Sequence, residues 1–278
     1  MYPTITTFLH DDEAPTAAFE WALSAARTWR VHLNVICAGI DATEPGFYYA
    51  GAQAFAVNQN LDVAQENANR LEKIVTERLS REVVAHDVQT VTLMGANVAM
   101  FLAERARMND LVVLPAPYAK TRQHLDVLAV ETCLFESRVP VVVIPDAYAG
   151  PIEPKKVLLA WNEAPEALIA AKTALPLLTK AEAVLVTIID PPSHAANRSD
   201  PGGRLAQFLS RHGAKPEISV LGRSQSSTAT ILCQRAFETD CEMIVMGAYG
   251  HSRLRESILG GATRDMLEAA EIPVLMAH

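Results

Sequence analysis

Long hydrophobic runs are absent from this sequence. Its apolar stretches, of which residues 139–144 are typical, fall well short of the roughly 20 residues that a membrane-spanning helix needs. Residues 1–12 contain no basic region followed by an apolar run, so no secretory signal peptide is predicted. The sequence therefore predicts no membrane-spanning helix, and we expect a cytoplasmic protein.

Cysteine is also scarce. The four cysteines, Cys37, Cys133, Cys233 and Cys241, form no Cys-x-x-Cys pair and have no histidine at a metal-ligand spacing. Thiols without such partners are usually buried and reduced in cytoplasmic proteins. We expect no disulfide framework and no metal site.

Positive charge is in deficit. The chain has 24 Lys and Arg against 32 Asp and Glu, a formal net charge of −8. A polyanion would on average be repelled by such a surface. The balance argues against non-specific nucleic-acid binding and leaves room for a local phosphate site.

The familiar catalytic motifs are missing as well. The sequence has no Gly-x-Ser-x-Gly elbow, no His-Glu-x-x-His and no Gly-x4-Gly-Lys-Ser/Thr loop. No acid and base pair stands near the glycine-rich segment described below. We therefore assign no catalytic residue and do not expect an enzyme.

The chain does contain an internal repeat. Residues 12–15 (Asp-Glu-Ala-Pro) reappear as residues 162–165 (Asn-Glu-Ala-Pro), each between an apolar run and an Ala-rich helical stretch. The ends of the halves match too, because residues 139–142 correspond to residues 272–275. We predict two copies of one domain, 1–149 and 150–278, within the 278 residues.

Each half alternates short β-branched runs with helical patterns, which is typical of an α/β fold with a parallel sheet and helices on both faces. Five strands are expected per half. In the second half they are expected near residues 155–161, 181–189, 215–221, 242–247 and 272–277. Helices are expected to begin there near residues 163, 202, 226 and 260.

A glycine pattern follows the fourth strand of the second half. Gly247, Gly250 and Gly260 are separated by two and by nine residues, and Gly261, Ala262 and Thr263 follow at the start of a helix. Glycines allow close approach of the backbone to a ligand, and free N–H groups at a helix N-terminus suit a phosphate. The segment predicts a phosphate cradle.

This spacing, together with the terminal Ile272-Pro273-Val274-Leu275 strand, resembles the nucleotide-binding motif of the universal stress protein family. The repeated β/α pattern covers nearly the whole chain, as in a tandem member. The resemblance implies five-stranded parallel sheets of order 3-2-1-4-5, with ATP bound where the strand order reverses. It also implies that the last strands of the two halves, residues 139–144 and 273–276, pair as in a dimer.

Carried over by position, the resemblance implies a site for ATP, ADP or AMP, with or without magnesium, in the second half only. The residues implied are Ala160, Trp161, Asn162, Ile188, Met246, Gly247, Tyr249, Gly250, Gly260, Gly261, Ala262 and Thr263. Asn162 stands in place of an aspartate, and Gly261 in place of Ser or Thr. Ile188 would offer backbone groups to the adenine, and Trp161 would either stack on it or pack between sheet and helix.

The first half departs from the motif. Residues 114–122 contain two prolines and no glycine where the cradle should be, so that N–H donors are lost. Its nucleotide site is predicted to be degenerate. An aromatic segment over residues 45–55 precedes a long helix expected near residues 58–82, and it would be either a lid or part of its own domain.

Three hypotheses remain. The first is a stress-response regulator that binds an adenine nucleotide in the C-terminal domain and contacts protein partners. The second is a slow ATP hydrolase, which the missing acid at Asn162 disfavours. The third is a nucleotide-free scaffold, supported by the changes at Asn162 and Gly261. A homodimer is compatible with each of them.

Overall fold

The computed structural model describes residues 2–10, 16–41, 53–118, 124–191, 200–222, 227–248 and 261–278, with the side chains of residues 53–59 left aside. In these ranges the N-terminal half has β1 (Thr4–His10), α1 (Ala17–Trp29), β2 (His32–Asp41), α2 (Gln53–Leu79), β3 (His86–Met94), a 3-10 turn (Gly95–Asn97), α3 (Val98–Ala106), β4 (Leu111–Pro115), α4 (His124–Phe135) and β5 (Val141–Ile144).

The C-terminal half repeats this order. It contains β6 (Lys156–Ala160), α5 (Pro165–Thr173), α6 (Leu175–Leu178), β7 (Ala183–Ile189), α7 (Gly203–Arg211), β8 (Pro216–Leu221), α8 (Thr228–Glu238), β9 (Met243–Gly247), α9 (Gly261–Ala269) and β10 (Val274–Ala277). Each strand of this half lies within two residues of its predicted bounds. The predicted aromatic segment lies mostly outside the described residues.

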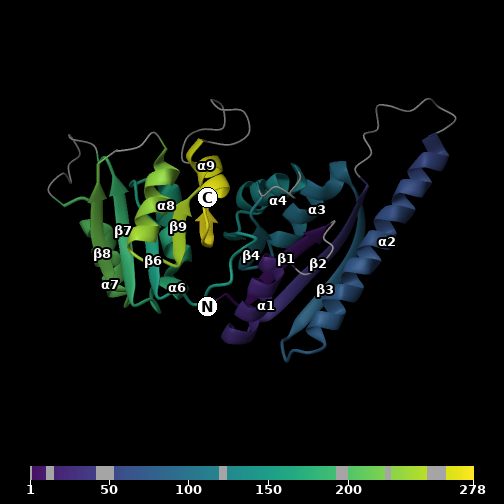
Figure 1. The fold of residues 1–278 in the computed structure, drawn as a ribbon, viewed down its shortest axis with the longest axis horizontal. Helices are drawn as coiled ribbons and strands as arrows, with labels where there is room; N and C mark the ends of the chain where they lie inside the picture. The colour runs from purple at the N-terminus through teal and green to yellow at the C-terminus, as the bar shows by residue number, and fades with distance from the viewer. Residues whose placement is uncertain are drawn as a thin grey trace.

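All ten strands form one sheet, in the order β3-β2-β1-β4-β5-β10-β9-β6-β7-β8. Each half is parallel internally and has the predicted order 3-2-1-4-5. The halves meet where β5 and β10 run antiparallel, with Leu275 opposite Val142. The predicted pairing of the last strands is confirmed, and Figure 1 shows the two halves on either side of this junction.

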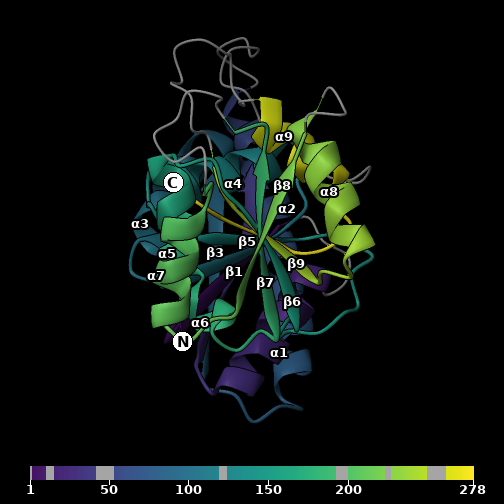
Figure 2. The ribbon, with the colours of Figure 1, turned by 90° about the vertical axis from the view of Figure 1, so that its left-hand side faces the viewer.

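Helices cover both faces of the twisted sheet (Figure 2), because its central strands β4, β5, β9 and β10 are apolar and buried along nearly their whole length. One core lies under α1, α2, α5, α6 and α7, and the other lies under α3, α4, α8 and α9. Both cores continue across the β5–β10 junction. The first core includes Ile144 and Leu275, and the second includes Val143 and Met276.

Side-chain contacts also join the halves. The Tyr2 hydroxyl donates to the Thr173 carbonyl at 2.9 Å, and Trp29 Nε1 donates to Glu153 Oε1 at 3.1 Å. Burial raises the pKa of the Tyr2 hydroxyl, which keeps it a donor. Together with the shared sheet, these contacts fix the position of one half against the other.

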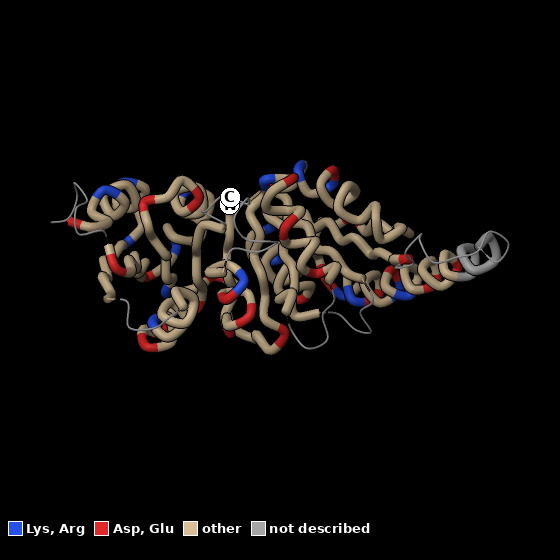
Figure 3. The backbone as a smooth tube through the Cα atoms, turned by 90° about the horizontal axis from the view of Figure 1, so that it is seen from above, with Lys and Arg blue, Asp and Glu red and all other residues tan. Residues whose placement is uncertain are grey.

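Residues of both charge signs are interspersed along the backbone of both halves in Figure 3. In the described part of the chain, no helix is long and apolar enough to cross a membrane. The four cysteines are free thiols, and burial raises the pKa of Cys37 and of Cys133 to about 12. These thiols are therefore protonated at neutral pH.

Candidate functional site

A cavity of about 270 Å³ lies at the carboxyl ends of β6, β7 and β9. β6 separates β7 from β9 in the sheet, so the strand order reverses at this point. Ligands of open α/β sheets bind in the crevice that such a reversal creates. Its described lining residues are Ala160, Trp161, Asn162, Ala164, Glu166, Ala167, Thr187, Ile189, Thr228, Leu232, Met246, Gly247, Ala262 and Thr263.

The structure brings seven of the twelve predicted site residues together around this cavity. They come from the end of β6, the end of β9 and the first turn of α9, and they are Ala160, Trp161, Asn162, Met246, Gly247, Ala262 and Thr263. Gly261 begins α9 as an exposed residue and does not line the cavity. Tyr249, Gly250 and Gly260 lie outside the described residues.

Ile188 does not reach the cavity. Its side chain is 5% exposed and packs in the core on the opposite face of the sheet, while its neighbours Thr187 and Ile189 line the cavity. The Trp161 amide donates to the Thr187 carbonyl at 2.9 Å, so the backbone of Thr187 faces β6. Backbone groups in a strand alternate in direction, so those of Ile189 face the same side, beyond the end of β6. The residue that offers its backbone to the cavity is therefore Ile189, one position after the predicted Ile188.

Asn162 organises the turn between β6 and α5. Its Oδ1 accepts a hydrogen bond from the Ala164 amide at 3.1 Å, and Glu163 between them has a φ of 61°. Such a turn is common for asparagine. Oδ1 has a second lone pair for a ligand, and the amide nitrogen of Asn162 donates where an aspartate would accept.

Glu166 is a lining residue that the sequence reading missed. It lies in the first turn of α5, and its Oε2 is buried without a hydrogen-bond partner in the part of the chain that the structure describes. A buried carboxylate oxygen without a donor is costly. The only sign in the sequence was an acid directly after Pro165, which is typical of any helix N-terminus.

Two helix N-termini border the cavity on the side away from β7. Thr228 begins α8, and Thr263, which is only 3% exposed, lies in the first turn of α9. The Ser227 hydroxyl donates to Asp265 Oδ2 at 2.7 Å and fixes one helix against the other. Unpaired N–H groups at helix N-termini favour anions, so this border suits a phosphate.

Gly247 has a packing role. A Cβ on this residue would lie 2.5 Å from the amide nitrogen of Ala167 and 2.6 Å from the carbonyl carbon of Glu166. The first turn of α5 therefore packs directly on the backbone of β9. Other atoms do approach Gly247 closely, as a ligand was predicted to do, but these atoms belong to α5.

We expect Gly247→Ala to lower the free energy of unfolding by about 1–3 kcal/mol, because α5 must move away from β9. Urea denaturation followed by circular dichroism measures this change. Gly222→Ala is the matched control, since a Cβ there would meet nothing within 4 Å. Equal stability of both variants would contradict the packing role.

The corresponding positions of the N-terminal half carry larger side chains. Ile5 pairs with Leu111 as Val157 pairs with Met243, so Phe8 holds the register position of Ala160, and His10 that of Asn162. His10 Nε2 lies 3.2 Å from Asp126 Oδ1 of α4, and both side chains are at most 5% exposed. Pro115 takes the position of Gly247 at the end of the fourth strand.

The phenyl ring of Phe8 is 4% exposed and its centroid lies 5.5 Å from that of His10. An aromatic side chain and a buried polar pair thus stand where the C-terminal half has a cavity. The two prolines predict a degenerate nucleotide site in this half, and these larger side chains favour the same prediction.

Comparison with known proteins bears on the fold and the family. The universal stress protein family matches residues 153–278. A universal stress protein from Archaeoglobus fulgidus superposes with a TM-score of 0.72 at 14% identity, covering 98% of this chain and 95% of that one. No curated protein matches the sequence.

Two structures from Pseudomonas aeruginosa also span the chain. A protein of unknown function from strain PAO1 has a TM-score of 0.62 at 15% identity and covers 99% of this chain and 92% of its own. A protein from strain UCBPP-PA14, assigned as a universal stress protein, has a TM-score of 0.59 at 16% identity, with 99% and 93% covered. The C-terminal half therefore carries a domain of the universal stress protein family, and the N-terminal half repeats its fold.

Proposed function

We propose that the C-terminal cavity binds an adenine nucleotide and that the chain is a stress-response regulator whose partner contacts depend on this binding. The observation that carries the proposal is the position of the cavity. It lies at the reversal of strand order, between a strand edge that suits a base and helix N-termini that suit phosphates.

Each part of the nucleotide has a matching group. The backbone of Ile189 faces the adenine edge, beside the Thr187 side chain. The buried carboxylate oxygen of Glu166 accepts from the ribose hydroxyls. The Thr263 hydroxyl and the first amides of α9 donate to the phosphates.

The lining favours binding over hydrolysis. Among the described residues around the cavity there is no lysine or arginine, and Glu166 is the acidic one. Phosphoryl transfer relies on cations that neutralise the developing charge. A magnesium ion held between Glu166 and the phosphates would supply one cation, because Mg²⁺ is often held by one or two carboxylates plus phosphates.

The proposal is tested first on the purified full-length chain. We expect heat denaturation to release ATP or AMP, seen on an anion-exchange column, and the stripped protein to bind ATP in a calorimetric titration with and without magnesium. ADP that accumulates with magnesium would support hydrolysis instead. If neither experiment detects a bound nucleotide, the proposal is overturned, and the nucleotide-free scaffold is the hypothesis that remains.

Two variants then test the phosphate side in opposite directions. Thr263→Val removes a hydroxyl and is expected to weaken ATP binding several-fold, by about 0.5–1.5 kcal/mol. Gly261→Ser adds one where a Cβ meets nothing within 4 Å, and it is expected to strengthen binding by a similar factor. Unchanged affinity in both variants would place the phosphates elsewhere.

A further inference from the structure

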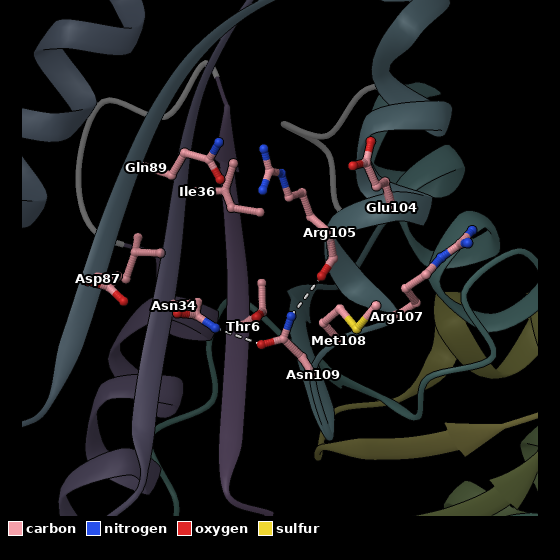
Figure 4. Close-up of a pocket in the computed structure, with 11 residues that line it drawn as sticks. Thr6, Asn34, Ile36, Asp87, Gln89, Glu104, Arg105, Arg107, Met108 and Asn109 are labelled. Carbon is pink, nitrogen blue, oxygen red and sulfur yellow. Dashed lines mark hydrogen bonds between the residues drawn. The ribbon is translucent and has the colours of Figure 1, made fainter.

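A second cavity, of about 510 Å³, lies in the N-terminal half between the sheet and α3. The residues that line it from the strands, among them Thr6, Asn34 and Gln89, stand near the amino ends of β1, β2 and β3. Arg105 and Asn109 line it from α3 and the loop that follows (Figure 4). This is the opposite end of the strands from the crevice described above, so the two cavities are separate.

Thr6 gives the floor of this cavity an unused polar group. Its side chain is 3% exposed, and its Oγ1 is buried with no hydrogen-bond partner among the residues that the structure describes. Most buried hydroxyls in proteins are paired, because an unpaired one lowers stability. A ligand that reaches the floor of the cavity would supply the missing partner.

Asparagine side chains hold one wall in place. Asn34 Nδ2 donates to Asn109 Oδ1 at 2.7 Å, and Asn109 Nδ2 donates to the Arg105 carbonyl at 2.8 Å, as the dashed lines in Figure 4 show. These bonds tie the end of α3 to β2. They leave the Oδ1 atom of Asn34 as an acceptor beside Thr6.

Arg105 brings a positive charge to the cavity. Figure 4 shows its guanidinium extending from α3 toward the strands, next to Gln89. In the described part of the chain, no ion pair joins Arg105 to a carboxylate, and its guanidinium lies 5.5 Å from the centroid of the Phe101 ring. Of the other charged lining residues, Asp87 is paired with His32 at 3.1 Å, whereas Glu104 and Arg107 extend away from the strands.

The C-terminal half shows that the fold does not require these polar groups. By sheet register, Leu158 holds the position of Thr6, and Leu185 that of Asn34. Leu158 is fully buried in the core under α8 and α9, and Leu185 packs against the same core. The polar floor is therefore particular to the half that carries larger side chains at its nucleotide crevice.

We propose that this cavity binds a small hydroxylated organic anion. Its carboxylate or phosphate pairs with the guanidinium of Arg105, which can hold either group with two parallel hydrogen bonds. Its hydroxyls bond to Thr6 Oγ1, Asn34 Oδ1 and the Gln89 amide. The chain would then respond to two ligands, one in each half.

Three small probes that share the same three-carbon skeleton test the proposal by NMR on the full-length chain. They are glycerate, glycerol 3-phosphate and uncharged glycerol. We expect at least one of the two anions to shift the backbone amide signals of residues 6, 34, 89 and 105–109 saturably, with a dissociation constant of about 1 mM, as befits so small a ligand. The anion that binds more tightly identifies the charged group. Glycerol is expected to give no saturable shift, and the absence of saturation for both anions would overturn the proposal.

Variants separate binding from folding. Arg105→Gln is expected to weaken binding of the anion at least about tenfold, whereas Arg107→Gln, which removes the same charge from a lining side chain that extends away from the strands, leaves it unchanged. Thr6→Val is expected to weaken binding while raising the melting temperature by about 2–4 °C, because the unpaired hydroxyl is gone. Equal effects of Arg105→Gln and Arg107→Gln would mean non-specific attraction and contradict the site.

Discussion

Ala160→Phe is expected to weaken ATP binding at least about 100-fold while leaving the fold intact. Ala160 lines the C-terminal cavity at the end of β6, and Phe8 holds the same register position in the N-terminal half. A phenyl ring at residue 160 would occupy the space that the nucleoside needs. Because the N-terminal half folds with this ring, the sheet and its helices can accommodate it.

Calorimetric titration with ATP measures the loss, and Ala160→Ser is the matched control, because it changes polarity and leaves the space free. The free energy of unfolding, from urea denaturation, is expected to change by about 1 kcal/mol or less in both variants. If Ala160→Phe binds ATP as tightly as Ala160→Ser, the nucleoside does not lie in this cavity. If it unfolds, the N-terminal half depends on more than one side chain to accommodate the ring.

The architecture could be predicted from the sequence because it rests on local and repeated signals. Each buried strand of the C-terminal half appears as an apolar run, and the two runs at residues 139–142 and 272–275 match because they become the paired β5 and β10. A break in the helix after β6 was not predicted. Leu175 and Pro176 begin a separate helix, α6, since proline removes a backbone donor that a continuous α5 would need.

The candidate site was predicted where it follows from strand ends and was missed where it depends on register. The resemblance implied Ala160, Asn162 and Met246, and they line one cavity because the carboxyl ends of adjacent parallel strands meet at one edge of a sheet. At the cavity stands Ile189 in place of the implied Ile188, because successive backbone groups of a strand face opposite sides. Glu166 belongs to a helix, and no motif marks it.

Two further features of the site could be recognised only in the structure. Gly247 was interpreted as a ligand contact, because a sequence cannot show that the atoms close to it belong to α5. The repeat suggested that Asp12 corresponds to Asn162, whereas the sheet register places His10 there. The partner of His10 is Asp126, 116 residues further along the chain, and no pattern in the sequence connects them.

Asp126→Ala is expected to lower the free energy of unfolding by about 3–5 kcal/mol, measured by urea denaturation. The carboxylate lies in the first turn of α4, 4% exposed, and contacts the buried His10 ring at the end of β1. Removing one member of a buried polar pair takes a hydrogen-bond partner away from the other. The double variant His10→Leu/Asp126→Leu is expected to recover most of this loss, because apolar side chains of similar volume can replace such a pair.

The comparison of these two variants decides what the pair does in the N-terminal crevice. Recovery in the double variant, with ATP still bound in the C-terminal half alone, would mean that the pair and Phe8 fill the space that a nucleotide takes in the other half. If the double variant is no more stable than Asp126→Ala, the polar contact itself holds α4 against β1 and filling the space is not enough. In both cases Pro115, which takes the position of Gly247, has no backbone N–H to donate. We therefore expect no nucleotide site to appear in the N-terminal half.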